Sequence, residues 1–337
     1  MTKDLLNQII TKNLTKKILV AGDVMVDEYI YGTVSRICPE APVAVLKAMK
    51  KHLLPGGAAN VACLLTCLSL PTRIMGCLHS NDYPGKFLQG FLNKSGVEQL
   101  CINYPAGETI VKQRLMSQNQ MLLRIDYENC QNLGDSLSQQ AMAYLSQVEN
   151  DTSLIILSDY AKGFLSDQLV TNIIAWSRNR GISVVVDPKG NDYTKYLGAT
   201  LLTPNRNEVA LAVGKRINNL EELVEAGYQL LKRTENQALI ITNGAEGVLV
   251  LERDGVFYHL PALSCSHPNV IGAGDAFIAG LTLGISSEAG LLEAACLGIY
   301  TAGLAVRKTV SRYPLLSEIV YLLKTQPFTI KQYFKVI

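Results

Sequence analysis

The chain has 337 residues, of which 48% are hydrophobic and 18% are charged, a composition that excludes disordered, collagenous and coiled-coil proteins. Its 31 basic and 29 acidic residues leave a net charge of +2, and the basic residues are scattered, so nucleic acid is not an expected partner. The longest uncharged apolar run, residues 294–306, is shorter than the roughly 20 residues that a membrane-spanning helix needs. We therefore expect a globular protein that does not cross a membrane.

Residues 1–15 place apolar side chains at helical spacing but interrupt them with polar ones, which predicts a short helical extension and no signal peptide. This favours a cytoplasmic location, where thiols stay reduced. The eight cysteines include one close pairing with histidine, Cys265 with His267, which is too sparse for a zinc site. We expect the cysteines to be inert, buried thiols.

From Ile18 onward, short apolar runs alternate with amphipathic segments, a pattern typical of βαβ units and of an α/β fold with a mostly parallel sheet. Several runs are apolar on both faces, as buried parallel strands are. The expected strands are residues 17–21, 73–77, 154–158, 183–187, 200–203 and 238–242, followed by a hairpin partner at 248–251.

Two regions, residues 28–47 and 108–127, alternate polar and apolar residues and predict a small separate sheet. Set against the α/β body, this sheet would form a lid that excludes water, which phosphoryl transfer requires because water competes as the acceptor. An ordinary edge hairpin is the alternative. We see no internal repeat and no long linker, so we expect one domain over residues 1–337 with a discontinuous lid.

A glycine-rich segment, Gly272-Ala273-Gly274-Asp275, precedes an apolar helical run at residues 278–285. Small residues at a helix start let backbone amides approach an anion, and the helix dipole adds to the attraction. The Asp275 carboxylate would repel a phosphate there unless its purpose is to take a proton from an attacking hydroxyl. Helix capping without any function is the alternative.

A second glycine pair, Gly56-Gly57, opens another expected helix and is followed by Asn60, whose amide can hydrogen-bond a sugar hydroxyl. Neither glycine segment fits the dinucleotide fingerprint, because the third glycine of that motif is missing after Gly274. The sequence also lacks a P-loop motif. A dehydrogenase and a P-loop enzyme are therefore disfavoured.

The Gly-Gly pair near the N-terminus and Gly-Ala-Gly-Asp near the C-terminus resemble the ribokinase (PfkB) family of sugar kinases. Four longer stretches resemble the branch that phosphorylates D-glycero-β-D-manno-heptose 7-phosphate; they are residues 22–47, 109–128, 157–166 and 184–209. The resemblance extends from about Ile18 to at least Gly280. It implies a ribokinase-like, Rossmann-type sheet flanked by helices, with a β-sheet lid that often forms the contact of a homodimer.

The same resemblance implies phosphorylation of the heptose C1 hydroxyl by ATP, giving the 1,7-bisphosphate for ADP-heptose and lipopolysaccharide core biosynthesis. Asp275 would be the general base, and the amides of Gly272, Ala273 and Gly274 would form the anion hole. Asn205 and Glu208 match an element that organises Mg²⁺ through water, although helix capping after Pro204 would also explain them. The expected nucleotide loop contains Thr242, Gly244 and Gly247.

The resemblance also implies which residues bind the sugar phosphate. Asp27, Gly56, Gly57, Asn60, Asp159 and Lys162 match positions that bind acceptor hydroxyls or face the cleft. Asn119 and Gln120 belong to the Asn-Gln-x-x-x-Arg-x-Asp pattern of the heptose branch. Because a sugar phosphate is a dianion, cations must converge on it, and the candidates are Arg36, Lys112, Arg114, Arg124 and Lys189.

This chain departs from the family in the segments that commonly hold a monovalent cation beside the anion hole. Asn269-Val270-Ile271 stands where the family has Asp-x-Thr, and residues 306–312 lack the expected glycine. We expect that the K⁺ site is lost and that Arg307 or Lys308 supplies the positive charge. A weakened or inactive kinase is the alternative.

Two other functions stay open from the sequence. The chain could phosphorylate a different sugar or sugar phosphate, or it could be a non-catalytic homologue that binds a sugar phosphate or a nucleotide. Retention of Asp275, Asn205 and Glu208 argues against a pure binding protein, which needs no proton acceptor. Because related bifunctional enzymes carry an added nucleotidyltransferase domain, we expect a separate adenylyltransferase to act downstream of this chain.

Overall fold

A large sheet runs through the computed structural model, which describes residues 9, 14–103, 107–118, 120–128, 134–265, 270–308, 313–326 and, by backbone alone, 331–334. Its order is β16 (Lys331–Phe334), β15 (Val256–Leu260), β14 (Val248–Glu252), β13 (Ala238–Thr242), β12 (Leu201–Leu202), β11 (Ser183–Asp187), β10 (Thr152–Ser158), β1 (Lys17–Gly22), β4 (Thr72–Met75) and β6 (Glu98–Gln99). In this spatial order, the neighbours from β13 across to β6 pair parallel, whereas those from β16 to β13 pair antiparallel. The mostly parallel sheet is therefore confirmed.

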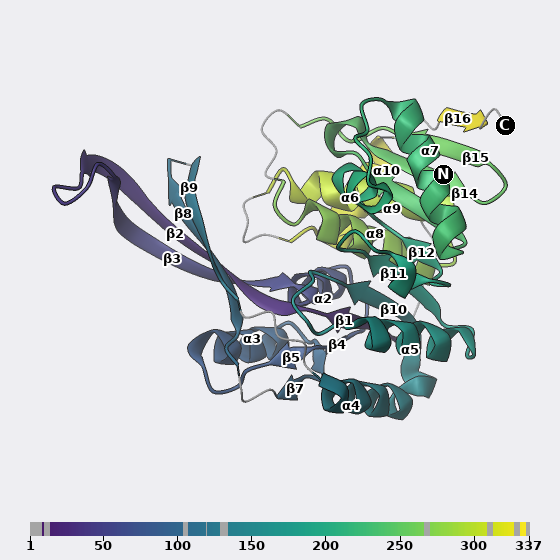
Figure 1. The fold of residues 1–337 in the computed structure, drawn as a ribbon, viewed down its shortest axis with the longest axis horizontal. Coiled ribbons are helices and arrows are strands. Elements are labelled where there is room, and N and C mark those ends of the chain that lie inside the picture. The colour runs from purple at the N-terminus through teal and green to yellow at the C-terminus, as the bar shows by residue number, and fades with distance from the viewer. Residues whose placement is uncertain are drawn as a thin grey trace.

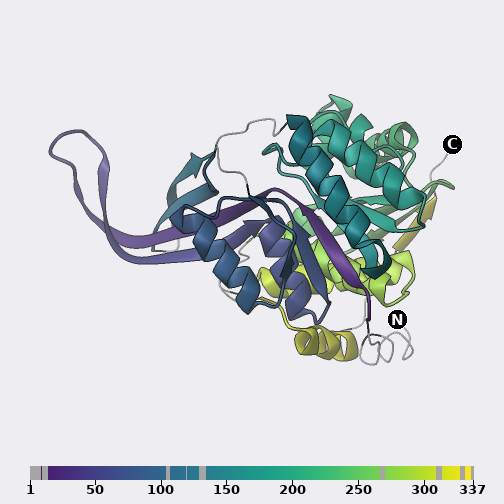
Figure 2. The ribbon, with the colours of Figure 1, turned by 90° about the horizontal axis from the view of Figure 1, so that it is seen from below.

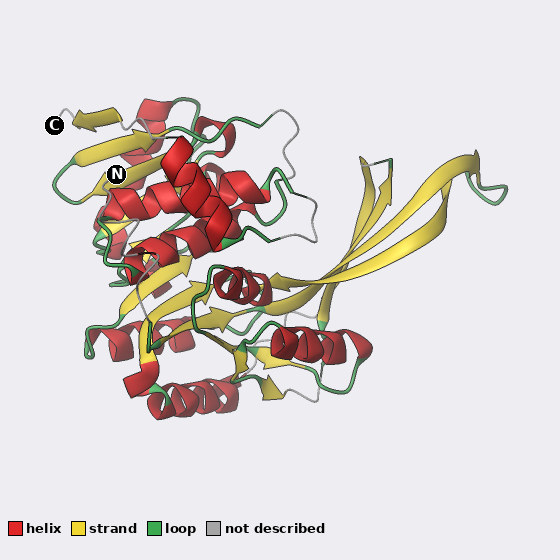
Figure 3. Ribbon diagram, turned by 180° about the vertical axis from the view of Figure 1, so that it is seen from behind, coloured by secondary structure: helices red, strands yellow, loops and turns green. Residues whose placement is uncertain are grey.

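Helices cover both faces of this sheet (Figure 3). Successive residues of a strand point to opposite faces, so Ile18 and Val20 of β1 join one core while Leu19 and Ala21 join the other. The first core contains α2 (Ala58–Cys67), α3 (Tyr83–Lys94), α8 (Ala273–Ser286), α9 (Leu291–Ala305) and α10 (Leu316–Thr325). The second contains α4 (Gly134–Gln147), α5 (Asp167–Arg178), α6 (Arg206–Val213) and α7 (Leu220–Thr234).

A four-stranded sheet, which we call the arm, extends away from this body (Figures 1 and 2). Its order is β3 (Ala44–Gly57), β2 (Val24–Ile37), β8 (Ile110–Ser117) and β9 (Gln120–Tyr127). The separate small sheet is confirmed, but the β2–β3 hairpin extends beyond the expected residues 28–47 at both ends. The buried base of the hairpin, where residues 24–26 and 55–57 are all buried, lacks the polar alternation that marks its exposed part.

Several smaller expectations differ from the structure. The segment expected as one strand at 73–77 divides into β4 and β5 (Cys77–Leu78), and β5 pairs with β7 (Ile102–Asn103) in a separate two-stranded sheet. The strand expected at residues 200–203 is shorter in the structure, where β12 comprises Leu201–Leu202. The predicted N-terminal extension, residues 1–15, lies almost wholly outside the described residues.

No described helix combines the length and the apolarity that crossing a bilayer requires.

The seven described cysteines are free. Two of them, Cys63 and Cys296, are buried, and burial raises the pKa of each thiol to about 12, so both stay neutral and pack as small apolar groups.

Close packing of α8 on α9 generates a prediction about stability. A Cβ atom at Gly280 would lie 2.2 Å from Thr301 Oγ1 and 2.4 Å from the Leu297 carbonyl oxygen, and backbone cannot move aside easily. We expect Gly280→Ala to lower the free energy of unfolding by about 1–3 kcal/mol, measured by urea denaturation. Gly90→Ala in α3, where a Cβ meets nothing within 4 Å, is the matched control and should be neutral or stabilising. Equal stability of the two variants would contradict this account of the α8–α9 contact.

Candidate active site

A pocket of about 290 Å³ lies at the carboxyl edge of the parallel sheet, where the base of the arm meets the starts of α2 and α8. Open α/β sheets bind ligands at this edge because the loops that follow the strands converge there. Each of the parallel strands β10 to β13 ends at the pocket and contributes at least one lining residue; these are Asp159, Tyr160, Asp187, Thr203 and Thr242.

The structure brings thirteen of the predicted site residues together around this pocket; they are Asp27, Gly57, Asn60, Lys112, Arg114, Asp159, Lys189, Asn205, Glu208, Thr242, Gly272, Gly274 and Asp275. Other predicted residues do not line it; these are Arg36, Gly56, Gln120, Arg124, Lys162, Gly244, Gly247 and Ala273. Arg36 is exposed on the outer half of β2, opposite Val45 of β3. Asn119 lies outside the described residues. The binding roles of all these residues stay predictions.

The start of α8 requires glycine for two reasons. Gly272 caps the helix with a φ of 74°, in the left-handed region that glycine tolerates best. A Cβ atom at this position would also lie 3.2 Å from Asn60 Nδ2, so glycine lets Asn60 approach the helix start. The Ala273 amide already donates to the Val270 carbonyl at 3.2 Å, which makes it a poorer anion donor than expected.

Asp275 lies in the first turn of α8 and is only 6% exposed. Its two carboxylate oxygens have different partners: Asn60 Nδ2 donates to Oδ2 at 2.6 Å, and the Tyr160 hydroxyl donates to Oδ1 at 2.8 Å. The pKa of Asp275 is raised to about 6, mainly by burial and also by the charge of Asp27, while the two hydrogen bonds oppose this shift. A carboxylate that titrates near neutral pH in a pocket is suited to accept a proton.

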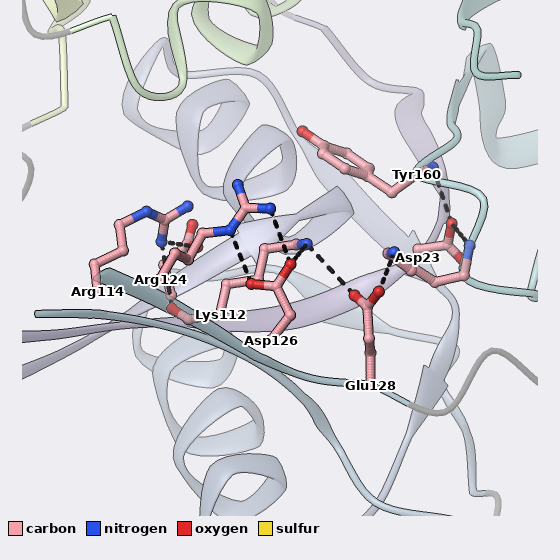
Figure 4. Close-up of polar contacts among 9 residues, drawn as sticks. Asp23, Lys112, Arg114, Arg124, Asp126, Glu128 and Tyr160 are labelled. Atoms are coloured by element: carbon pink, nitrogen blue, oxygen red, sulfur yellow. Dashed lines mark hydrogen bonds and ion pairs between the residues drawn. The ribbon is translucent and has the colours of Figure 1, made fainter. Parts of the chain in front are cut away.

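The loop after β10 is held by a buried aspartate that sequence reasoning missed (Figure 4). Asp23 is 3% exposed, and its carboxylate accepts the backbone amides of Tyr160, Lys162 and Phe164 at 2.9, 3.0 and 3.1 Å. Burial raises the pKa of Asp23, and these amides oppose that shift by favouring the charged form. Its sequence signals are its place directly after the buried strand β1 and within the stretch 22–47 that resembles the heptose branch.

A second buried carboxylate, within the loop itself, also fixes it. Asp159 is 2% exposed and accepts Lys195 Nζ and the Tyr196 hydroxyl, each at 2.7 Å, as well as the Ala161 amide. Both Oδ atoms of Asp159 are therefore engaged within the protein. This arrangement makes Asp159 a support of the loop, and the predicted contact of Asp159 with sugar hydroxyls stays untested.

Ion pairs occupy the base of the arm. The Arg114 guanidinium bonds Asp27 and lies over the Tyr29 ring, with Arg114 Cζ 5.2 Å from the ring centroid. Burial raises the pKa of Asp27, although the nearby cations Arg114 and Lys112 oppose this shift. This pair joins β2 to β8 at the pocket wall.

Next to this pair, at the base of the arm, cations alternate with carboxylates (Figure 4). Lys112 Nζ lies 3.5 Å from both Asp126 and Glu128, and Arg124 donates to Asp126 at 2.9 Å. Lys162 of the body reaches Glu128 at 2.7 Å and so links the arm to the loop after β10. The expected phosphate-binding cations of the arm base are thus already paired with carboxylates.

On the nucleotide side, Asn205 and Glu208 form a capping box at the start of α6. Asn205 Oδ1 accepts the Glu208 amide at 3.0 Å, and Glu208 Oε2 accepts the Asn205 amide at 2.8 Å. Lys189 pairs with the other carboxylate oxygen of Glu208 at 2.6 Å. The capping interpretation of these residues is therefore observed, and their role toward Mg²⁺ stays a prediction.

The pocket also contains Asp187, at the end of β11, which sequence reasoning did not select. Burial raises the pKa of Asp187 well above its usual range, and the charges of Glu208 and Asp275 add to this effect. The described residues contain no cluster of three or more His, Cys, Asp or Glu side chains that could hold a metal ion by themselves. Mg²⁺ that arrives with a nucleotide needs only one or two carboxylates and keeps several waters, so Asp187 and Glu208 fit such an ion.

Comparison with curated proteins identifies relatives along most of the chain. The bifunctional protein HldE of Geobacter metallireducens is 39% identical over 290 residues, covering 86% of this chain and 59% of its own length. HldE of Aeromonas hydrophila is 40% identical over 297 residues, covering 87% of this chain and 60% of its own length. The chain therefore spans about 60% of the length of these relatives.

Solved structures share the fold at low sequence identity. Phosphofructokinase-2 from Escherichia coli, in complex with substrates and products, has a TM-score of 0.77 at 16% identity, over 92% of this chain and 98% of that one. Ribokinase from Arabidopsis thaliana, complexed with ribose and ATP, has a TM-score of 0.72 at 17% identity, over 93% and 100%. The pfkB family carbohydrate kinase pattern matches residues 15–318. The chain therefore belongs to the pfkB family of carbohydrate kinases, with a ribokinase-like fold.

Proposed function

We propose that this carbohydrate kinase transfers the γ-phosphate of ATP to the C1 hydroxyl of D-glycero-β-D-manno-heptose 7-phosphate. The product, the 1,7-bisphosphate, would serve ADP-heptose and lipopolysaccharide core biosynthesis. The observation that carries the proposal is the buried Asp275 carboxylate at the start of α8, within a pocket built from the sheet edge and the arm. The similarity to proteins named HldE supports the heptose branch of the family.

The geometry suits a direct transfer. Asp275 accepts the proton of the acceptor hydroxyl as the new oxygen–phosphorus bond forms and the bond to the leaving ADP breaks. The positive end of the α8 dipole and the amides of its first turn stabilise the charge on the transferring phosphoryl group. Kinases of this family use ATP, typically with Mg²⁺, which neutralises phosphate charge when bound; Asp187 and Glu208 would hold it through water.

The sugar phosphate would bind at the base of the arm. Lys112, Arg114 and Arg124 lie on its strands, and Lys162 lies on the facing loop. A phosphate dianion would compete with Asp126 and Glu128 for these cations and could draw the arm toward the body. On this proposal the arm acts as a lid that excludes water from the reaction.

The general-base role predicts the effect of Asp275→Asn. Because the amide cannot take the proton, we expect the turnover number to fall by about 10²–10⁴, while binding of heptose 7-phosphate measured by calorimetry changes little. The assay measures ADP release with ATP, Mg²⁺ and heptose 7-phosphate, and ³¹P NMR detects the 1,7-bisphosphate. Asp254→Asn, in the β14–β15 turn, is the control that should retain activity.

Two different outcomes would contradict different parts of the proposal. Full turnover by Asp275→Asn would contradict the general-base role. Faster phosphorylation of another acceptor, such as fructose 6-phosphate or ribose, by the unmodified enzyme would contradict the heptose assignment and leave the kinase class intact.

We further propose that activity does not require K⁺, because a side chain replaces the ion. Arg307 Nη2 donates to the Ser264 carbonyl at 2.8 Å and so ties the segment after α9 to the segment before α8. Lys308 pairs with Glu318 and the Tyr313 carbonyl, which makes Arg307 the better candidate of the two. Asn269 and residues 309–312 lie outside the described residues.

The test replaces K⁺ with tetramethylammonium at constant ionic strength. We expect the turnover number to stay within about twofold, because a permanent guanidinium supplies the charge that the ion would provide. Arg307→Met should lower turnover in both salts, and Arg253→Met, on the turn after β14, is the control. A strict K⁺ requirement of the unmodified enzyme would refute the idea.

The arm is also where we expect a second copy of the chain to bind. Exposed apolar side chains concentrate on it; they are Val34, Ile37, Val43, Met49, Met121, Leu122, Leu123 and Tyr127. Exposed apolar side chains gathered on one part of a molecule are typical of interaction sites. Sedimentation velocity should show a dimer at micromolar concentration and a monomer for Leu123→Glu, with Tyr321→Glu on α10 as the control. A monomeric unmodified chain would contradict the homodimer.

A separate adenylyltransferase acting on the product stays a prediction.

A further inference from the structure

The Tyr160 hydroxyl contacts the carboxylate on which the proposed chemistry depends. It donates to Asp275 Oδ1 at 2.8 Å, and Asn60 donates to the other oxygen at 2.6 Å. Two hydrogen bonds on different oxygens fix the rotation of the carboxylate plane, which one bond alone would leave free. Each carboxylate oxygen can accept a second hydrogen bond, so room for an acceptor hydroxyl remains.

The backbone of Tyr160 is itself fixed by the body of the protein. Its amide donates to Asp23 Oδ2 at 2.9 Å, and the amides of Lys162 and Phe164 bond the same carboxylate. Burial and the nearby Asp275 charge raise the pKa of the Tyr160 hydroxyl well above its usual value. Tyr160 therefore stays protonated, donates to Asp275, and cannot be the base itself.

The other titratable groups around Asp275 act in the opposite direction. Asp27 of β2 raises the pKa of Asp275, and the charge of Asp275 in turn raises the pKa of Asp187 at the end of β11 and of Tyr313 before α10. Burial and the negative charge of Asp27 favour a neutral Asp275. The two hydrogen bonds, from Tyr160 and Asn60, are the contacts that favour its charged form.

We propose that Tyr160 is a positioning residue that, together with Asn60, orients the Asp275 carboxylate and keeps it ionised, and therefore able to accept a proton, at neutral pH. This inference rests on the proposed role of Asp275 as general base. It assigns a function to the loop after β10, residues 159–166, beyond the predicted contact with the sugar. It also explains why Asp23 holds this loop by three amides.

The direction of the pH effect follows from the charge state. Asp275 acts as a base only when it is deprotonated, so activity is present above its pKa and is lost as the pH falls through it. The Tyr160 hydrogen bond stabilises the charged form and lowers this pKa. Its removal raises the pKa, and activity is then lost at a higher pH.

The experiment compares the pH dependence of the turnover number for the unmodified enzyme, Tyr160→Phe and Tyr193→Phe, from pH 5 to 9. We expect the acid limb of Tyr160→Phe to move upward by about one pH unit, which is a loss of about tenfold below pH 6 and a much smaller loss at pH 8.5. Tyr193→Phe also removes one hydroxyl from a buried ring, and the Tyr193 hydroxyl has no hydrogen-bond partner among the described residues, so its acid limb should match the unmodified enzyme.

A second measurement needs no acceptor sugar. The ¹³C NMR resonance of the Asp275 carboxyl, assigned by its loss in Asp275→Asn, should titrate about one pH unit higher in Tyr160→Phe than in the unmodified protein. Coincident acid limbs and coincident titrations in Tyr160→Phe would overturn the inference, whatever the plateau rate. If Asp275→Asn keeps full activity, the general-base proposal fails instead, and the NMR titration shows whether Tyr160 still controls the ionisation of Asp275.

Discussion

A single buried aspartate, Asp23, joins the parts of the molecule that meet at the pocket. It is the one residue between β1 and β2, so it marks the point where the chain leaves the body and enters the arm. Its carboxylate holds the loop that carries Tyr160, and its carbonyl accepts the Ala58 amide at 3.0 Å at the start of α2, the helix that carries Asn60. Both donors to Asp275 are thus positioned through Asp23. A buried carboxylate is unfavourable unless it is hydrogen-bonded, and here three amides compensate the loss of water.

This constraint explains the glycine pair before α2. Gly57 has a φ of 57°, and a Cβ atom there would lie 2.4 Å from the Asp23 carbonyl oxygen. Gly56 packs against Asp27, whose Oδ2 would lie 2.9 Å from a Cβ atom. The pair therefore lets β3 and α2 pass close to the two aspartates at the base of the arm. In this structure the pair allows close packing around the pocket, and its contact with acceptor hydroxyls stays a prediction.

The paired charges of the pocket explain why the overall composition did not indicate a cluster of positive charge. The cations at the arm base pair with Asp27, Asp126 and Glu128, and Lys189 pairs with Glu208. Positive charge is therefore concentrated locally but balanced by neighbouring carboxylates, consistent with a net charge of only +2. An anionic substrate has to exchange with these carboxylates, which favours ligands that carry several negative charges.

Local patterns predicted the parallel sheet, the separate small sheet and the two glycine-rich helix starts, because strand periodicity and helix-start chemistry are properties of short segments. The meeting of the two helix starts at one site was implied only by the family resemblance. The two hydrogen bonds that hold the Asp275 carboxylate could not be predicted, since their donors, Asn60 and Tyr160, are 215 and 115 residues away in the sequence. Asp23 lies within the stretch 22–47 that resembles the heptose branch, but nothing in that stretch indicates that its carboxylate holds a loop more than 130 residues away. Asn205 and Glu208 have the same spacing whether they cap a helix or organise Mg²⁺. These assignments depend on tertiary contacts that one sequence does not encode in any local pattern.

The most direct test of the central claim is a crystal structure of the protein with heptose 7-phosphate and a non-hydrolysable ATP analogue. The account predicts that the acceptor C1 hydroxyl lies within about 2.6–3.2 Å of an Asp275 carboxylate oxygen that still accepts from Tyr160 or Asn60. It also predicts the γ-phosphate in line with this hydroxyl at the start of α8. A C1 hydroxyl bound away from Asp275, with another side chain in contact with it, would contradict the account.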